Sequence, residues 1–239
     1  MKKYDIILFD ADGTLYDFDR SEARAVSEVL EICSLPHDDD TVELYHRIND
    51  AEWKALERGE TTRERLKVER FRKLLTVLAE RGVEIGVTAK NMADMYVEHL
   101  SQQCILFPES EPVCRTLSEQ AKLYIITNGI TRVQRGRFAK SPITKYFGDM
   151  FISEAMGAVK PELRYFEIVF DALGITHDEA KERVLVVGDS LTSDIKGAIA
   201  AGLDSCWLNP HGHDSGDVMP TYTIKSLCEL YDICAQERE

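Results

Sequence analysis

Short apolar runs recur along the chain, and each ends in a polar or glycine-containing turn that a helical pattern follows. Continuous apolar runs of this length are typical of strands buried on both faces of a sheet. Because strands and helices alternate at this spacing, right-handed crossovers and a parallel sheet are expected. The predicted strands are Ile6–Phe9, Leu123–Ile126, Met150–Ile152, Val184–Val187 and Ser205–Leu208.

Helical patterns between the later strands complete an α/β unit with a Rossmann-like parallel sheet. In such a sheet, ligands bind beyond the carboxyl ends of the strands, so the polar endings of the runs are expected to meet at one edge. The predicted helices of this unit are Glu109–Gln120, Thr131–Lys140, Pro161–Leu173, Ser193–Ala201 and a closing helix within Lys225–Glu239.

The gap between the first two strands is far too long for one crossover, and its periodicity is helical throughout. We therefore predict an inserted all-α subdomain at residues 18–103, with residues 1–17 and 104–239 forming the α/β core. Polar residues that could cap helices precede or begin each pattern. The predicted helices are Ser21–Cys33, Thr41–Glu57, Thr62–Arg81 and Thr88–Gln103, with caps at Ser21, Asp40, Thr61 and Thr88.

Composition narrows the choice of partners. The formal net charge is −13 and the pI is about 5.0, which disfavours a nucleic-acid polymer as partner. A small anionic substrate would need local cations or a metal ion at its site. The six cysteines show no zinc or redox spacing and are expected to be free thiols. No stretch is long enough to span a membrane, and we expect a soluble cytoplasmic protein.

The sequence "DADGT" follows the first predicted strand and brings two carboxylates together. At the sixth and twelfth positions, where a calcium-binding loop needs Gly and Glu, the chain has Leu15 and Ser21. An Asx turn would explain one aspartate and not both. At the tip of the strand, Asp10 can attack a substrate and bind a metal ion, while Asp12 can reach the leaving group. Gly13 permits the sharp turn.

Two further motifs offer groups for an anion. Thr127 and Asn128 end the second strand, and backbone N–H groups at the helix start by Gly129 are typical of an anion site, although this motif taken alone favours an ordinary capped turn. Lys160 precedes Pro161, which suits the first position of a helix. Its ammonium is then able to pair with phosphate oxygens and carboxylates, unless it is a surface lysine.

The last motif is "VVGDSLTSDIKG", in which Asp189 ends an apolar strand and Asp194 follows near a helix start. Ser193 or Asp194 could be a helix N-cap. Asp189 facing Asp10 and Asp12 would be repelled unless a cation lay between them. Mg²⁺ fits, because it takes oxygen ligands and binds substrate phosphate.

In this order, the four motifs resemble those of the haloacid dehalogenase-like (HAD) hydrolase superfamily, and the inserted helices resemble its helical cap. The resemblance implies that Asp10 is the nucleophile and forms an aspartyl-phosphate, and that Asp12 is the general acid and base. Thr127 and Lys160 would hold the phosphoryl oxygens. The implied Mg²⁺ ligands are Asp10, the Asp12 main-chain carbonyl, Asp189 and Asp194.

The flanks of these motifs are most similar to the pyrimidine 5′-nucleotidase branch, which implies a nucleoside monophosphate as substrate and a monomer or homodimer. Other hypotheses for the function remain open. The protein could be a phosphatase of another small phosphate, such as a sugar phosphate or phosphoglycolate, a phosphonatase or mutase, or a non-catalytic HAD-like binding module. The predicted phosphate- and substrate-binding residues are Gly13, Thr14, Asn128, Gly129 and, from the cap, Phe18.

Overall fold

The structure is a computed structural model that describes residues 4–235. The chain divides into two compact units. The core unit takes the described residues up to Asp17, then Ile105–Gln134, and the described residues from Phe138 onward. The helical unit takes Phe18–Cys104 together with Arg135–Arg137. Each unit is described by itself.

A six-stranded sheet, parallel throughout, forms the centre of the core unit, with the strand order β3-β2-β1-β4-β5-β6. The predicted α/β parallel-sheet fold is therefore confirmed. All five predicted strands are present, and β6 was not predicted because its three residues are flanked by polar ones. The strands are β1 (Ile6–Asp10), β2 (Lys122–Thr127), β3 (Phe147–Ile152), β4 (Val184–Gly188), β5 (Asp204–Leu208) and β6 (Tyr222–Ile224).

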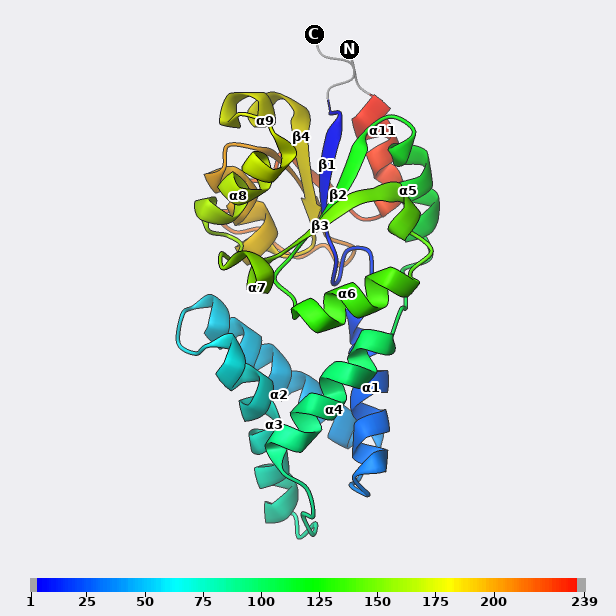
Figure 1. Cartoon of the computed structure of the whole chain (residues 1–239), viewed down its shortest axis with the longest axis vertical. Helices are drawn as coiled ribbons and strands as arrows, with labels where there is room; N and C mark the ends of the chain where they lie inside the picture. Colours follow the sequence, from blue (N-terminus) through cyan, green and yellow to red (C-terminus); the bar gives the residue numbers. More distant parts are fainter. Residues whose placement is uncertain (1–3, 236–239) are drawn as a thin grey trace. The chain divides into compact units, whose positions relative to one another are not determined.

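Helices cover both faces of this sheet (Figure 1), with α8 and α9 on one face and α5 and α11 on the other. Six described helices lie wholly in the core unit, and α6 (Thr131–Lys140) lies in it except for Arg135–Arg137. The six are α5 (Ser110–Ser118), α7 (Ser153–Met156), α8 (Leu163–Leu173), α9 (His177–Arg183), α10 (Lys196–Ala200) and, among the described residues, α11 (Leu230–Ala235). Of the predicted closing helix, residues 236–239 lie outside the described residues.

Burial on both faces explains why β1 and β4 are apolar up to their last residues, Asp10 and Gly188. Every residue of β1 and β4 is buried. Leu8 and Val186 pack with Phe166 and Val169 of α8 in one cluster. Each fully buried side chain of this size contributes roughly 1.5–3 kcal/mol. The two central strands are therefore firmly placed, and the polar residues at their carboxyl ends are placed with them.

Two local predictions in the core unit were wrong, and one helix was not predicted. Pro161 is not the first residue of a helix, because α8 begins at Leu163 and Lys160–Pro161 lie in the preceding turn. Ser193 does not begin a helix either: a π-helical turn spans Leu191–Ile195, and the Ser190 side chain accepts the N–H of Ser193. Helix α9 was not predicted, because its single buried residue leaves no apolar stripe.

The helical unit consists of four helices, and its predicted helix starts were partly wrong. The first helix begins at Phe18, so Ser21 is a buried helical residue and not a cap. The caps of the next two helices are Asp38 and Thr62, whose side chains accept the backbone N–H three residues later. The cap at Thr88 was predicted correctly. The helices are α1 (Phe18–Ile32), α2 (Asp39–Glu57), α3 (Arg63–Glu80) and α4 (Ala89–Gln102).

A buried polar cluster lies inside the helical unit. The guanidinium of Arg70 is 4.6 Å from the centre of the Tyr96 ring and donates to Asn49 Oδ1 at 2.7 Å. Asn49 in turn donates to Glu22, which also contacts His46 at 2.6 Å. Burial raises the pKa of Glu22 and disfavours its charged form. The hydrogen bond with His46 and the positive charge of Arg70 oppose this effect and stabilise the carboxylate.

The two connections to the helical unit run side by side within the core unit. Tyr16 and Leu106 form an antiparallel bridge. The N–H of Asp17 donates to the carbonyl of Ile105 at 2.9 Å. The polypeptide thus leaves and re-enters the core unit at one place, close to the end of the "DADGT" turn.

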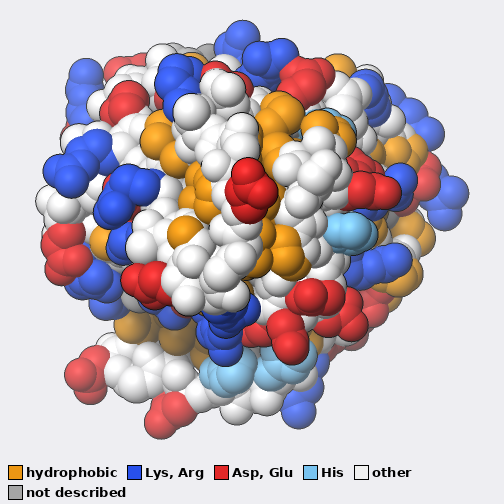
Figure 2. All heavy atoms as spheres, turned by 90° about the horizontal axis from the view of Figure 1, so that it is seen from below, with side chains coloured by type: hydrophobic (Ala, Val, Ile, Leu, Met, Phe, Trp, Pro, Cys, Tyr) orange, Lys and Arg blue, Asp and Glu red, His pale blue; other side chains and the backbone are white. Residues whose placement is uncertain are grey.

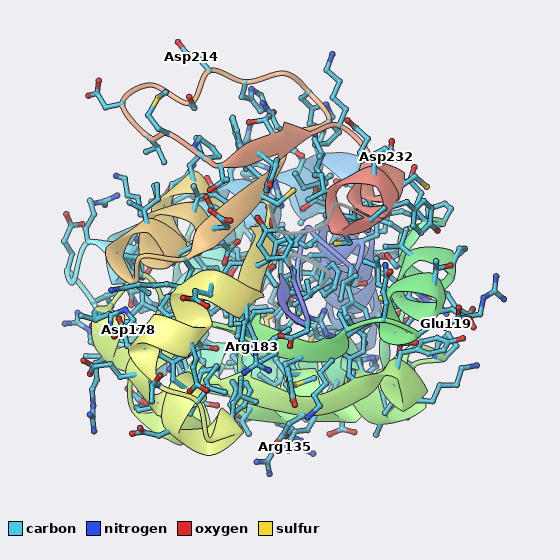
Figure 3. The ribbon with its side chains drawn as sticks, turned by 90° about the horizontal axis from the view of Figure 1, so that it is seen from above. Glu119, Arg135, Asp178, Arg183, Asp214 and Asp232 are labelled. Atoms are coloured by element: carbon cyan, nitrogen blue, oxygen red, sulfur yellow. The ribbon has the colours of Figure 1, made fainter. Side chains whose placement is uncertain are left out.

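The exterior is charged and mixed. On the face shown in Figure 2, acidic and basic side chains are interspersed over the surface. In the core unit (Figure 3), Arg183 of α9 binds Asp5 at 2.9 Å, and Asp214 lies in the loop between β5 and β6. None of the described helices is both long enough and apolar enough to cross a bilayer. The six cysteines are free thiols, as predicted.

Candidate active site

The site is built on the carboxyl ends of three neighbouring strands. Asp10 is the last residue of β1, Thr127 is the last residue of β2, and Asp189 follows directly after β4. Because β1 lies between β2 and β4, these three residues meet at one edge of the sheet. The site therefore occupies the place where ligands bind in open parallel sheets.

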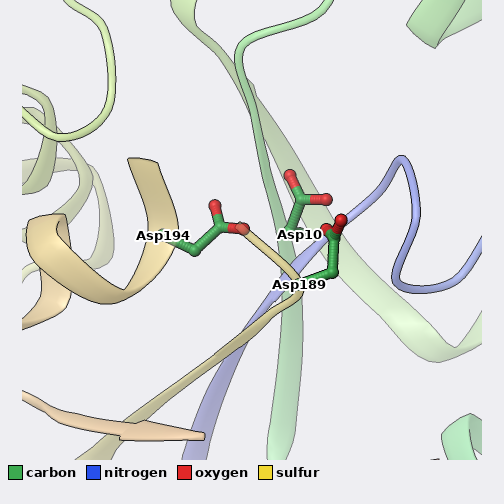
Figure 4. A group of neighbouring side chains, drawn as sticks. All are labelled: Asp10, Asp189 and Asp194. Carbon is green, nitrogen blue, oxygen red and sulfur yellow. The ribbon is translucent and has the colours of Figure 1, made fainter. Parts of the chain in front are cut away.

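Three carboxylates converge at this edge (Figure 4). Asp10, Asp189 and Asp194 each offer one oxygen within 4.8 Å of the other two. The ammonium of Lys160 lies against two of them, at 2.7 Å from Asp10 Oδ1 and 2.7 Å from Asp194 Oδ1. It also donates to the carbonyl of Ile126 at 3.0 Å, so all three of its hydrogens are used.

Burial makes the charged forms of the carboxylates in this cluster costly. Lys160 is 2% exposed and Asp194 is 1% exposed. Burial raises the pKa of Asp10 well above its usual range, and attraction to Lys160 only partly offsets this. Burial, followed by repulsion from Asp194, raises the pKa of Asp189 to about 7. Burial alone would lower the pKa of Lys160, but Asp10 and Asp194 raise it. One ammonium therefore does not neutralise the carboxylates around it.

The Asn128 side chain fixes the backbone of Lys160. Its amide Nδ2 donates to the Lys160 carbonyl, and its Oδ1 accepts the Lys160 N–H, both at 2.9 Å. This reciprocal pair holds Lys160 in the turn before α8 and directs its side chain inward. The sequence prediction for Asn128 concerned phosphate binding, which remains a prediction for its main chain.

Thr127 is held so that its hydroxyl lies at the strand end. The Gly129 N–H donates to Thr127 Oγ1 at 3.0 Å, and the Thr127 N–H donates to the hydroxyl of Tyr165 at 3.0 Å. Tyr165 donates in turn to the Phe151 carbonyl of β3 at 2.7 Å. Since the Gly129 N–H uses one lone pair of the Thr127 oxygen, the hydroxyl hydrogen is left for another acceptor.

Gly13 makes room for Asp189. A Cβ on Gly13 would lie 2.5 Å from Asp189 Oδ2, and Gly13 has φ of 83°, which side chains rarely adopt. The neighbouring Thr14 is buried, and its hydroxyl donates to Asp189 Oδ1 at 3.1 Å. Both residues thus hold the carboxylate of Asp189 from the side of the "DADGT" turn, while their predicted contact with substrate remains a prediction.

Gly188 does the same for Asp194. A Cβ on Gly188 would lie 2.3 Å from Asp194 Oδ2. Asp194 is not a helix N-cap: it lies within the π-helical turn and accepts the Ser190 N–H at 3.1 Å on Oδ2. The extra residue of a π-helical turn changes the direction of the side chains that follow it. This local geometry brings Asp194 to Lys160.

Asp12 has a neighbour that the sequence analysis missed. The amide Nε2 of Gln134 in α6 donates to Asp12 Oδ2 at 2.6 Å. Gln134 is 1% exposed, although the residues around it in "TRVQRGR" are mostly basic and polar. A polar residue within a helix that shows little amphipathic pattern gives no sequence indication of an inward direction.

The donor set at this edge fits a hard divalent cation. Asp10, Asp189 and Asp194 are all oxygen donors, which Mg²⁺ prefers, and their excess negative charge needs a cation beyond Lys160. Lys160 donates to Oδ1 of Asp10, and no described residue donates a hydrogen bond to its Oδ2. One carboxylate oxygen of Asp10 is thus still available to a metal ion or a substrate.

The predicted site residues of the core unit lie at this edge. Lys160 contacts Asp10 and Asp194, and Asp189 lies beside these two carboxylates. Asp12 and Gly13 lie in the turn that follows β1, Thr127 ends β2, and Asn128 and Gly129 follow it. Phe18 belongs to the helical unit, where it is the first residue of α1 and is half-buried.

Known proteins share this sequence and architecture. A family model described as haloacid dehalogenase-like hydrolase matches residues 4–202. A Bacillus subtilis protein named as a HAD-hydrolase, YfnB, is 37% identical, covering 98% of this chain and 96% of its own. The pyrimidine 5′-nucleotidases PynA of Streptococcus pneumoniae and YjjG of Escherichia coli are 33% and 31% identical. They cover 96% and 95% of this chain, and 94% and 96% of their own length.

The same architecture occurs in a solved structure. The crystal structure of YfnB, described as bound to magnesium and as revealing interdomain movement, superposes with a TM-score of 0.89. It is 36% identical and covers 98% of this chain and 100% of its own.

Proposed function

Because the chain belongs to the haloacid dehalogenase-like hydrolases, we propose that it is a Mg²⁺-dependent phosphomonoesterase that acts on pyrimidine nucleoside 5′-monophosphates through an aspartyl-phosphate. The family predicted from the four motifs is confirmed, as are the likeness to pyrimidine 5′-nucleotidases and the enzyme class of HAD-type phosphatase. The substrate, the metal ion and the residue roles are the proposal.

One observation carries the chemistry: the nucleophile candidate and a second acid stand two residues apart, beside a buried lysine. In the proposed first step, an Asp10 carboxylate oxygen attacks phosphorus and the bond to the leaving oxygen breaks. Asp12 gives its proton to that oxygen, so that the product leaves as an alcohol. An acid at this position is what an alkyl phosphate ester needs, since an alkoxide is a poor leaving group.

In the second step, Asp12 takes a proton from water, and the water oxygen attacks phosphorus. The bond between phosphorus and Asp10 then breaks, which restores the free carboxylate and releases inorganic phosphate. The hydroxyl of Thr127 would bind a phosphoryl oxygen in both steps, and Lys160 would bind another by giving up one of its three present hydrogen bonds. The contact of Lys160 with Asp10 supports this role, because the ammonium already lies beside the attacking group.

The metal ion of the proposal is Mg²⁺, held by the side chains of Asp10, Asp189 and Asp194 and by the main-chain carbonyl of Asp12. When bound, it supplies positive charge that offsets the negative charge of phosphate and carboxylates. The oxygen donor set supports this choice, and so does the magnesium in the crystal structure of the relative YfnB.

The substrate class comes from relatives that are named as pyrimidine 5′-nucleotidases and that match the chain over most of its length. We propose further that residues 18–103 act as a cap that selects the substrate, with Phe18 as one contact, as expected from the sequence. The substrate is then a small phosphorylated metabolite. A cytoplasmic location and a monomeric or homodimeric state stay predictions.

A phosphatase screen tests the proposal. The purified protein is assayed with Mg²⁺ for phosphate release from nucleoside monophosphates, including deoxyribose and modified pyrimidine forms, and from sugar phosphates. We expect the highest kcat/KM for a pyrimidine nucleotide. A clear preference for sugar phosphates would overturn the substrate class but not the chemistry.

The chemistry itself is tested with Asp10→Asn, which is expected to release no phosphate from p-nitrophenyl phosphate. Asp178→Asn is a matched control, because the Asp178 side chain is 95% exposed on α9. Full activity of Asp10→Asn would exclude the proposed nucleophile.

A further inference from the structure

A hydrogen bond joins Gln134 to Asp12, the proposed acid and base. It joins residues 122 positions apart and is 2.6 Å long. The Gln134 side chain is buried, so its amide has little freedom to turn toward solvent. Helix α6 is itself held at its start, where the Thr131 N–H donates to the Glu154 carboxylate at 2.7 Å. The amide therefore meets Asp12 from a fixed helix.

Gly129 provides the space that this contact requires. A Cβ on Gly129 would lie 2.0 Å from Gln134 Nε2 and 2.8 Å from its Cδ, distances at which the amide would have to move. Gly129 does not need the left-handed backbone region, since its φ lies outside that range. Close packing against Gln134, and not backbone freedom, is thus the reason for a glycine at this position.

We propose that Gln134 is a positioning residue that holds the Asp12 carboxylate in its catalytic direction, and that Gly129 is a glycine in order to admit the Gln134 amide. This inference rests on the proposed phosphomonoesterase function and deepens it, since the sequence motifs assign no role to Gln134.

The contact suits a group that must both give and take a proton. A carboxylate oxygen and the carbonyl oxygen of a carboxylic acid both accept hydrogen bonds. With Oδ2 of Asp12 held by Gln134, proton exchange is assigned to Oδ1. In the first step the proton on Oδ1 passes to the leaving oxygen, and in the second step Oδ1 takes a proton from water. The bond to Oδ2 persists through both steps.

The test compares two esters that depend differently on the acid. The variant is Gln134→Met, which keeps the length of the side chain but removes the donor. For a nucleoside 5′-monophosphate, whose leaving group is an alcohol, kcat/KM is expected to fall by about tenfold or more, which is part of the roughly 10²–10⁴-fold that general acid catalysis supplies. For p-nitrophenyl phosphate, whose leaving group departs without a proton, kcat/KM is expected to change less than about threefold.

A second signature separates positioning from a loss of folded protein. Because Asp12 is also the base of the second step, Gln134→Met should hydrolyse the aspartyl-phosphate slowly. A pre-steady-state burst of p-nitrophenolate is therefore expected, followed by a lowered kcat. Gln103→Met is the matched control: Gln103 is also buried, at 6% exposure, but donates to Glu28 in the helical unit. Gln103→Met should leave the ratio of the kcat/KM values for the two esters unchanged.

The role of Gly129 is tested by a double-mutant cycle with Gly129→Ala and Gln134→Ala. If the Cβ acts by displacing the amide, Gly129→Ala lowers kcat/KM for the nucleotide in the wild-type chain but has little further effect in Gln134→Ala. Independent, multiplicative losses would contradict the proposed reason for the glycine.

The outcomes also separate this inference from the proposed function. If the wild-type protein releases no phosphate from any ester, the function fails, and the role of Gln134 fails with it. If the wild-type protein is active and Gln134→Met lowers kcat/KM for both esters equally, or for neither, only the role of Gln134 is overturned.

Discussion

Replacing Lys160 by methionine is expected to destabilise the core unit by an amount that grows with pH. The ammonium lies 2.7 Å from both Asp10 Oδ1 and Asp194 Oδ1, and the residue is 2% exposed, so water cannot take its place. Removing one partner of a buried ion pair typically costs about 3–5 kcal/mol. For a chain of this length, roughly 2–4 °C per kcal/mol gives a fall in Tm of about 6–20 °C at pH 8 in the presence of a chelator.

The dependence on pH follows from the direction of the pKa shifts. Burial raises the pKa of Asp10 and Asp189 in the folded chain above the unfolded value. Groups shifted in this direction contribute stability that is present at low pH and is lost as pH rises through the folded pKa. Without Lys160 the pKa of Asp10 rises further, so Lys160→Met loses more stability than wild type between pH 5 and pH 8.

The assay follows Trp207, whose indole N–H donates to the Asp189 carbonyl at 2.8 Å, by fluorescence during heating. A Trp53→Phe background removes the other tryptophan, which lies in the helical unit. Lys181→Met is the control, because this lysine is half-exposed and lies 3.6 Å from its partner. It should change stability by less than about 0.5 kcal/mol at either pH. An unchanged Tm for Lys160→Met at pH 8, or equal losses at pH 5 and pH 8, would refute the reasoning.

Three further predictions address the metal site, its packing and the helical unit. Gly188→Ala would place a Cβ 2.3 Å from Asp194 Oδ2, and we expect kcat/KM to fall by about a hundredfold. Gly86→Ala is the control: its Cβ would have no atom within 4 Å, so turnover should not change. Since the pKa of Asp189 is raised to about 7, protons compete with Mg²⁺ below that value, so calorimetric titration should give tighter Mg²⁺ binding at pH 8 than at pH 6. Arg70→Met removes a guanidinium that is 1% exposed and should destabilise the helical unit by about 3 kcal/mol, measured as a lower urea midpoint in circular dichroism, and an unchanged midpoint would mean that the cluster adds no stability.

The parts of the site that lie on strands were predictable from the sequence. The continuous apolar runs before Asp10, Thr127 and Asp189 identify buried strands, and parallel strands bring their carboxyl ends to one edge. That reasoning needs only local pattern and topology. It placed these three residues together without any knowledge of the side-chain contacts.

The parts that depend on contacts distant in sequence were not predictable. Asn128 binds the Lys160 backbone across 32 positions, and Gln134 binds Asp12 across 122. Neither residue follows a periodicity that points to its partner. The sequence placed Gly129 at a helix start and gave no indication that a Cβ there would meet the Gln134 amide. Such requirements become visible only when the backbone is placed.

Local turn chemistry explains most of the boundary errors. Several hydroxyl and carboxyl residues stand near each helix start of the helical unit, as in Thr61 and Thr62 or Asp38 and Asp40. Propensity alone does not distinguish which of two neighbours accepts the N–H three residues later. The π-helical turn at Leu191–Ile195, which brings Asp194 to Lys160, likewise has no local sequence pattern that predicts it.

Identification of the phosphorylated residue tests the central claim most directly. The protein is mixed with Mg²⁺ and substrate for a time shorter than one turnover, quenched in acid, digested and analysed by mass spectrometry. The account predicts phosphate on the peptide that contains Asp10, at the Asp10 carboxylate, and no such adduct in Asp10→Asn. Phosphate on any other side chain, or turnover with no phosphorylated peptide under conditions that preserve acyl phosphates, would contradict it.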